Sequence, residues 1–181
     1  MTPRAVLFRA DGIEAAEAMP DDGPDLQALF EESSDFFDLT AGLPPGPAEV
    51  QSLFAALPEG KTYDDKHVIS LFTKPEGLIG VIDVVRDYPV PGSWWMGLML
   101  LRPAMRGRGK GGIVFRSFME WAAAGGARDI YLSVKTQNEG AFKFWSRMGF
   151  EVAETRPPAC LGARDSVVVV MRRGTTRRPP M

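Results

Sequence analysis

A glycine-rich basic segment constrains this 181-residue chain more than any other. Residues 106–112 read Arg-Gly-Arg-Gly-Lys-Gly-Gly, after an apolar run at 94–101 that Arg102-Pro103 closes. Downstream, apolar residues recur at helical spacing: Ile113, Phe115, Phe118, Met119 and Ala122. The order predicts a strand, a tight turn and a helix N-terminus, where backbone amides lack partners and the helix dipole is positive. Together with the three basic side chains, this predicts a site for a phosphate-bearing ligand.

Three other interpretations of residues 106–112 are a P-loop, a dinucleotide-binding motif and a turn without a ligand. A P-loop requires Ser or Thr after its lysine, and Lys110 is followed by Gly111. The glycine spacing of a dinucleotide-binding fingerprint is present at 107, 109 and 112, but Asp129 is a weak acidic partner and the unit lies late in the chain. A nucleotide-dependent oxidoreductase is therefore a weaker alternative, and an exposed basic turn is the simplest one.

Two spaced motifs favour a different family. The first has the form L-x-V-x-P-x-x-[RQ]-x-x-G-x-[GA], matched by Met99, Leu101, Pro103, Arg106, Gly109 and Gly111. The second has the form N-x-x-A-x-x-[FL]-[YF]-x-x-x-G-F, matched by Asn138, Ala141, Phe144, Gly149 and Phe150, with Trp145 in place of Tyr or Phe. In this order and at this distance, they resemble the acyl-CoA site of the GNAT N-acetyltransferase superfamily. The resemblance is sharp over about residues 95–155.

The resemblance implies a single α+β domain: a mixed, mostly antiparallel twisted sheet of about six to seven strands, flanked by about four helices, with a splayed strand pair at the cofactor site. It assigns residues 1–172 to this domain and 173–181 to a basic, flexible tail. It also implies that acetyl-CoA binds at Met99, Leu100, Leu101, Arg106, Gly107, Arg108, Gly109, Lys110, Gly111, Gly112, Asn138, Ala141, Phe144 and Trp145, with residues 99–101 contacting it through the main chain.

Periodicity supports this architecture along the chain. Strands are predicted at residues 6–8, 67–72, 78–86, 94–101, 129–134, 150–154 and 166–171. A helical apolar face starts at Pro24 or Asp25 and includes Phe36 and Phe37, and a second one runs from Val50 until Pro58 and Gly60 stop it. Further helices are predicted at 109–125 and 138–148.

The catalytic groups are harder to assign. The family commonly uses a Glu near the start of the cofactor strand as base and a Tyr in the second motif as acid, but this chain has Trp95 and Trp145 there. Indole donates a hydrogen bond and has no useful acidity. Asp83 interrupts an apolar strand and is the first candidate for a replacement base, the alternative being a solvent-facing or backbone-bound carboxylate. His67 and Cys160 are weaker candidates, a lone surface histidine and a loop thiol.

Composition and charge further narrow the class of protein to which this chain can belong. A net charge of −2 and a pI near 5.5 argue against general nucleic-acid binding. One cysteine and one histidine cannot build an ordinary zinc site, so no metal is expected. No segment has the length of a signal peptide or a membrane span, which predicts a cytoplasmic protein. We therefore expect an acetyl-CoA-dependent N-acetyltransferase with an amine acceptor, and a homodimer is compatible with it. A non-catalytic acyl-CoA-binding module is the alternative.

Overall fold

The computed structural model describes residues 4–160 and 165–176, without the side chains of residues 159, 160 and 165. The described residues form one eight-stranded sheet with the spatial order β1-β2-β3-β4-β5-β6-β8-β7. Only β5 and β6 pair in parallel. The strands are β1 Val6–Ala10, β2 Ile13–Glu17, β3 Lys66–Thr73, β4 Gly77–Val85, β5 Ser93–Leu101, β6 Asp129–Lys135, β7 Glu151–Cys160 and β8 Asp165–Gly174.

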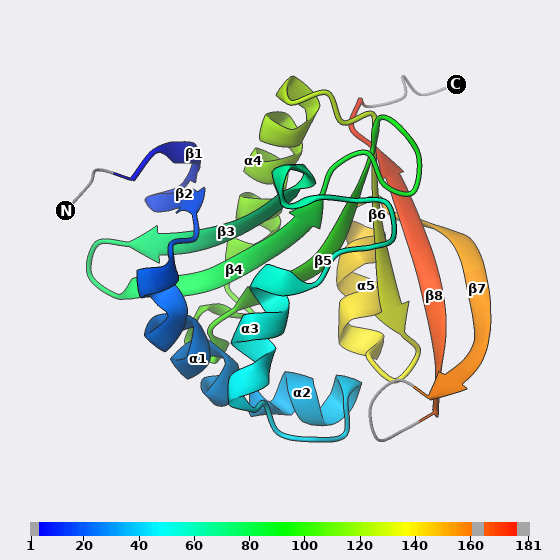
Figure 1. Cartoon of the computed structure of the whole chain (residues 1–181), viewed down its shortest axis with the longest axis horizontal. Coiled ribbons are helices and arrows are strands. Elements are labelled where there is room, and N and C mark those ends of the chain that lie inside the picture. Colours follow the sequence, from blue (N-terminus) through cyan, green and yellow to red (C-terminus); the bar gives the residue numbers. More distant parts are fainter. Residues whose placement is uncertain (1–3, 161–164, 177–181) are drawn as a thin grey trace.

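Five described α-helices cover the two faces of the sheet (Figure 1). They are α1 Gly23–Glu32, α2 Ser34–Thr40, α3 Pro47–Ala55, α4 Lys110–Ala124 and α5 Glu139–Arg147. One apolar cluster joins α4 and α5 to the sheet, and a second one joins α1, α2 and α3 to the opposite face. Because alternate residues of a strand point to opposite faces, β4 contributes Ile82 and Val84 to the first cluster and Val81 to the second. The result is a three-layer α+β domain, the predicted fold class.

The parallel pair opens partway along its length. Residues 93–96 of β5 pair with residues 129–132 of β6, and the pairing ends at Met96 and Leu132. Beyond that point β5 continues beside β4, whereas β6 follows β8 to Lys135. The predicted splay therefore lies between residues 97–101 and 133–135. It leaves one edge of the β5 backbone without a strand partner among the described residues.

The larger differences from the sequence prediction concern a missing strand, a divided helix and the ends of two strands. Strand β2 is not predicted, because its Ile-Glu-Ala-Ala-Glu sequence favours a helix by propensity, but pairing with β1 and β3 decides its conformation. The first predicted helix consists of two helices, α1 and α2, which the fully buried Ser33 separates. Strand β7 continues to Cys160, which is expected in a loop, and β8 includes Arg173 and Gly174, which are expected in the tail. Residues 177–181 lie outside the described residues.

Candidate active site

The splay holds a cleft with a volume of about 220 Å³. Strands β5 and β6 form its two sides, and helices α2 and α5 contribute the remaining wall. The lining residues are Phe36, Thr40, Met96, Gly97, Leu98, Met99, Leu132, Ser133, Val134, Lys135, Asn138, Ala141 and Trp145. Four residues predicted to bind the cofactor therefore meet here: Met99, Asn138, Ala141 and Trp145. Leu100 and Leu101 are buried in the two cores, so any contribution of theirs to the cleft is through the backbone.

The glycine-rich turn begins helix α4 as predicted. Gly107 and Gly109 adopt φ angles of 71° and 75°, a left-handed conformation that favours glycine, and a Cβ on either would have no atom within 4 Å. The first helical hydrogen bond runs from the Ile113 amide to the Gly109 carbonyl. The amides of residues 110–112 therefore have no partner within the helix. Open space above unpartnered amides fits the diphosphate of CoA.

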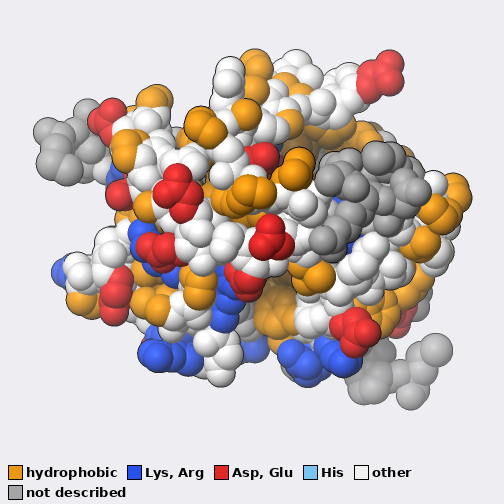
Figure 2. Space-filling model, turned by 90° about the horizontal axis from the view of Figure 1, so that it is seen from below, with side chains coloured by type: hydrophobic (Ala, Val, Ile, Leu, Met, Phe, Trp, Pro, Cys, Tyr) orange, Lys and Arg blue, Asp and Glu red, His pale blue; other side chains and the backbone are white. Residues whose placement is uncertain are grey.

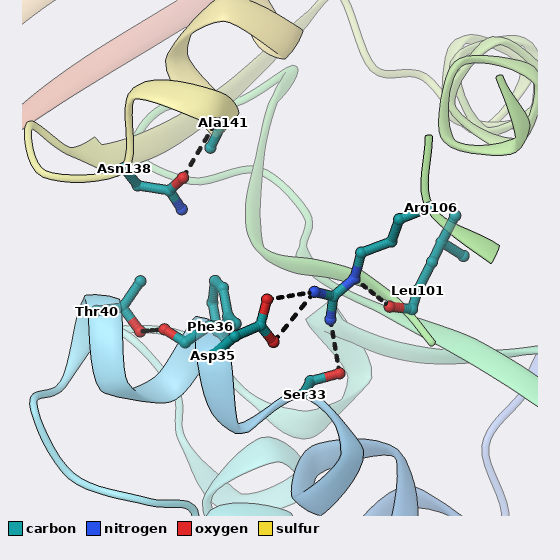
Figure 3. A network of polar contacts seen from close by, with 8 residues as sticks. All are labelled: Ser33, Asp35, Phe36, Thr40, Leu101, Arg106, Asn138 and Ala141. Atoms are coloured by element: carbon teal, nitrogen blue, oxygen red, sulfur yellow. Dashed lines mark hydrogen bonds and ion pairs between the residues drawn. The ribbon is translucent and has the colours of Figure 1, made fainter. Parts of the chain in front are cut away.

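Arg106 does not point its charge at this turn (Figure 3). Its Nε donates to the Leu101 carbonyl at 2.8 Å, Nη1 pairs with Asp35 Oδ2 at 2.8 Å, and Nη2 donates to Ser33 Oγ at 2.7 Å. All three guanidinium nitrogens thus have partners within the protein, and the predicted contact of Arg106 with the cofactor stays a prediction. The guanidinium instead ties the end of β5 to the junction of α1 and α2.

The remaining charges of the turn differ in their contacts. Lys110 Nζ lies 3.1 Å from Asp11 Oδ2 at the β1–β2 turn, and its side chain is one-third exposed. The exposed Arg108 has no ion pair or hydrogen bond within residues 4–160 and 165–176. In Figure 2, Lys and Arg side chains gather along the lower edge of the view, whereas most Asp and Glu side chains lie above them. One edge of the molecule is thus suited to an anion.

Helix α5 packs closely against the start of α4. Asn138 caps α5, accepting a hydrogen bond from the Ala141 amide at 3.0 Å, which confirms the capping role considered for it (Figure 3). A Cβ on Gly111 would lie 3.4 Å from the Phe144 ring, so this glycine permits the helices to approach. Trp145 is 8% exposed and packs edge-on against Phe115 at 5.2 Å between ring centroids. Trp145 is a core residue that also closes the cleft, with no proton to supply.

Asp83 lies next to the cleft, behind a bulge in β5. It pairs with Leu98, whereas Val84 pairs with Met96, so Gly97 is the extra residue of the bulge. A Cβ built on Gly97 would lie only 2.8 Å from Asp83 Oδ2. The carboxylate therefore occupies the space that any other residue at 97 would fill with its own side chain. Gly97 lines the cleft, so Oδ2 is the neighbour of a cleft-lining residue, on the face covered by α1–α3.

Burial raises the pKa of Asp83 above its ordinary value, and Lys66 partly offsets this effect. The side chain of Asp83 is 17% exposed, and its Oδ1 lies 2.7 Å from Lys66 Nζ. This ion pair is the one polar contact of Oδ1 among the described residues. The alternative of an ordinary solvent-facing carboxylate is therefore excluded. A partly desolvated carboxylate with a raised pKa is a stronger proton acceptor than an ordinary Asp side chain.

The other candidates for proton transfer lie elsewhere. His67 Nδ1 pairs with Glu17 Oε1, and its ring packs between Trp94 and Trp121 on the α4 side of the sheet. Since His67 and Lys66 are adjacent in β3, their side chains point to opposite faces, and His67 is turned away from Asp83. The side chain of Cys160 lies outside the described residues. Trp95 is half-buried beside Tyr88 and Tyr131 and has only an N–H to offer.

Several residues of the site escape prediction from the sequence, because they lie far from both motifs. Lys66 contacts Asp83 from the neighbouring strand, and Phe36 and Thr40 line the cleft from α2. Lys135 Nζ donates to the Thr40 carbonyl and so links β6 to α2. Only Gly97 gives a local signal, since a glycine inside an apolar strand indicates a bulge.

These features define a class of protein: an α+β domain with a splayed parallel strand pair and, beside it, a helix start with unpartnered backbone amides. The sequence model of the protein family described as "Acetyltransferase (GNAT) family" matches residues 26–150, more than half of the chain. The chain belongs to this family. Its members are acyltransferases that use acetyl-CoA, and the turn and cleft described above fit that molecule.

Solved structures give the same fold. An acetyltransferase from Thermus thermophilus is 26% identical, with a TM-score of 0.67 over 87% of this chain and 95% of that one. A GCN5-related N-acetyltransferase from Kribbella flavida is 21% identical, with a TM-score of 0.66 over 91% and 98%. Spermidine N-acetyltransferase from Vibrio cholerae, in complex with CoA and spermine, is 14% identical, with a TM-score of 0.72 over 91% and 96%. No curated protein matches the chain.

Two features are absent from the described residues. None of their helices has the length and apolar character needed to cross a membrane. Within the same residues, no group of three or more His, Cys, Asp and Glu side chains is placed to hold a metal ion.

Proposed function

We propose that this protein transfers the acetyl group of acetyl-CoA to a primary amine of a small molecule or a protein, with Asp83 as the general base. The observation that carries the proposal is the position of Asp83 Oδ2 beside Gly97, a residue that lines the cleft between the splayed strands. The family commonly has a base near the start of the cofactor strand, and the burial that raises the pKa of Asp83 favours that role.

The chemistry divides between the bound thioester and the protein. Acetyl-CoA supplies an acyl carbon already activated by its sulfur. The amine nitrogen gives one proton to Asp83 Oδ2, directly or through one water, as it bonds to that carbon. The carbon–sulfur bond breaks, the departing thiolate takes a proton from water, and Asp83 returns its proton to the solvent. The neutral amine and acetyl-CoA thus give the amide and free CoA with no net proton released.

The cleft suggests the direction from which the amine arrives. Asp83 lies on the α1–α3 face, and α2 contributes Phe36 and Thr40 to the cleft on that side. The turn at 106–112 and α5 belong to the other layer. We therefore place the acceptor on the α1–α3 side and the CoA diphosphate at the start of α4.

The test is a product assay with acetyl-CoA and a broad panel of amines, read as free thiol and as acetylated amine. Asp83→Asn should lower kcat about 100-fold, because a positioned base contributes roughly 10²–10⁴-fold. Asp64→Asn is the matched control, since Asp64 is an exposed carboxylate in the short helix Tyr63–Asp65. Turnover by Asp83→Asn at the wild-type rate would remove Asp83 from the mechanism.

The alternative function has its own outcome in the same assay. The tryptophans at 95 and 145 favour it, because neither can act as acid or base. CoA binding in calorimetry, combined with no turnover on any amine, would favour a non-catalytic acyl-CoA-binding module over the proposed enzyme.

A further inference from the structure

Lys66 is buried in a way that calls for an explanation. It is the first residue of β3, and only 4% of its side chain is exposed. Lysine is almost never this buried unless its ammonium is paired. Its Nζ lies 2.7 Å from Asp83 Oδ1 and donates to the Ala56 carbonyl at 3.0 Å. The charge is therefore paired with groups of the protein itself.

The second contact anchors the ammonium to a helix end. Ala56 is the C-cap of α3, the end at which unpaired carbonyls and the helix dipole attract a cation. Lys66 thus joins α3 to β4 through two directional contacts. The consequence for Asp83 is a fixed orientation, in which Oδ1 faces Lys66 in the interior and Oδ2 faces Gly97 and the cleft.

The other groups around Asp83 are apolar or committed elsewhere. Val68 of β3 and Leu98 of β5 lie directly opposite it, and the core that α1, α2 and α3 place on this face consists of apolar side chains. Nearby charged residues have their own partners: Lys61 pairs with Asp65, and Arg86 Nη2 donates to the Asp64 carbonyl. Among the described residues, Lys66 is therefore the charge that acts on Asp83.

We propose that Lys66 is a positioning residue of the active site, which holds the Asp83 carboxylate in its reactive orientation and sets the pH at which that carboxylate accepts a proton. This inference rests on the proposed role of Asp83 as base. Lys66 touches neither reactant and acts only through Asp83.

The Lys66–Asp83 ion pair determines the direction in which the pKa of Asp83 changes when Lys66 is replaced. Burial raises the pKa of Asp83, and the ammonium of Lys66 lowers it again. A base works only when it is deprotonated, so activity falls on the acid side as the pH drops through that pKa. Removing the ammonium would raise the pKa further, because a neighbouring opposite charge lowers a carboxyl pKa by about 1–3. The acid limb of the rate profile would then move to higher pH.

The experiment measures Asp83 directly and not only through activity. The carboxyl carbon of Asp83 is followed by NMR through a pH titration of protein labelled with ¹³C-aspartate, the signal being assigned by its loss in Asp83→Asn. The initial rate of acetylated product is measured over about pH 5 to 9 on the same variants. We expect Lys66→Met to raise the titration midpoint and the acid limb together by about one pH unit. Lys66→Arg should keep both near the wild-type values, because it retains the cation.

Controls separate this effect from loss of folding. Lys74→Met removes an equivalent charge from the exposed β3–β4 turn and should leave both readouts unchanged. Lys66→Gln serves as a second neutral variant if Lys66→Met is unstable, and circular dichroism checks both.

Each outcome decides the proposal. An Asp83 midpoint that is the same in Lys66→Met and wild type would overturn it. So would a midpoint that moves while the acid limb stays in place, since Lys66 would then control a carboxylate that catalysis does not use. Failure of the base assignment itself appears elsewhere, as full turnover in Asp83→Asn.

Discussion

The two sides of the cleft are built in opposite ways. On the cofactor side, the turn at 106–112, the start of α4 and the cap of α5 each form from residues close together in the chain. On the catalytic side, Asp83 of β4, Gly97 of β5 and Lys66 of β3 meet only because three strands lie side by side. A binding surface made of helix ends can therefore be recognised from motifs, whereas a buried ion pair across strands cannot.

The same comparison distinguishes Arg106 from Arg108, two arginines of the glycine-rich turn. Arg106 and Arg108 are two residues apart and carry the same charge. Arg106 is held by the Leu101 carbonyl, Ser33 and Asp35, and Arg108 is exposed without such contacts among the described residues. The charge of Arg106 thus supports the fold, while that of Arg108 is available to a ligand.

The largest effect should come from Gly109→Asp. The substitution forces a left-handed φ of 75° on a residue with a Cβ and places a negative charge at the positive end of α4. We expect CoA to bind at least about 100-fold more weakly in calorimetry, or ~2.7 kcal/mol.

Gly77→Asp is the matched control for that change. Gly77 also has a positive φ, 73°, with no atom within 4 Å of an added Cβ, but it lies on the β3–β4 turn. Gly77→Asp should lower the free energy of unfolding as much as Gly109→Asp does, and it should leave CoA affinity unchanged. Undiminished CoA affinity in Gly109→Asp would mean that the phosphate site lies elsewhere.

Gly97→Ala tests the catalytic side. The added Cβ would lie 2.8 Å from Asp83 Oδ2 and must displace the carboxylate. We expect kcat to fall roughly 20-fold, less than the loss of a positioned base, with little change in CoA affinity. In an Asp83→Asn background the same substitution should have almost no further effect. A full additional loss there would show that Gly97 acts through something other than Asp83.

Arg106→Met should affect stability more than binding. It removes donors from the buried Ser33 hydroxyl and from the Leu101 carbonyl, and it leaves Asp35 without its partner. We expect a loss of about 1.5 kcal/mol in the free energy of unfolding, measured with denaturant. Arg108→Met should show the reverse pattern, with weaker CoA binding at low salt and unchanged stability. A large loss of CoA affinity in Arg106→Met, equal to that of Arg108→Met, would contradict the division between the two arginines.

The smallest change is expected for Asn138→Ala. Its side chain accepts the Ala141 amide and caps α5, and loss of such a cap costs about 1 kcal/mol. Thermal unfolding should report this loss, and Asn138→Asp should restore most of it. If Asn138→Asp restores stability but not CoA affinity, the amide has a second role toward the cofactor.

Much of the fold could be predicted from periodicity, and the exceptions have physical causes. The strands at 94–101 and 129–134 and the helices after them lie within two residues of their predicted bounds, because strong apolar patterns and glycines mark their ends. Strand β2 could not be predicted in this way, since two paired neighbours override its helical propensity. The break at Ser33 escapes prediction for a similar reason: its hydroxyl is satisfied by Arg106, 73 residues away.

The sequence by itself determined the family, the splayed fold and the anion-binding turn, because each depends on spacings within a short stretch of chain. It also determined that Trp95 and Trp145 cannot supply a proton. Only the tertiary structure decided that Arg106 contacts the α1–α2 junction, that Asp83 lies beside the cleft-lining Gly97, and that Lys66 pairs with Asp83. These contacts join residues from different elements, and the direction of a charge depends on which partners the folded chain places within its reach.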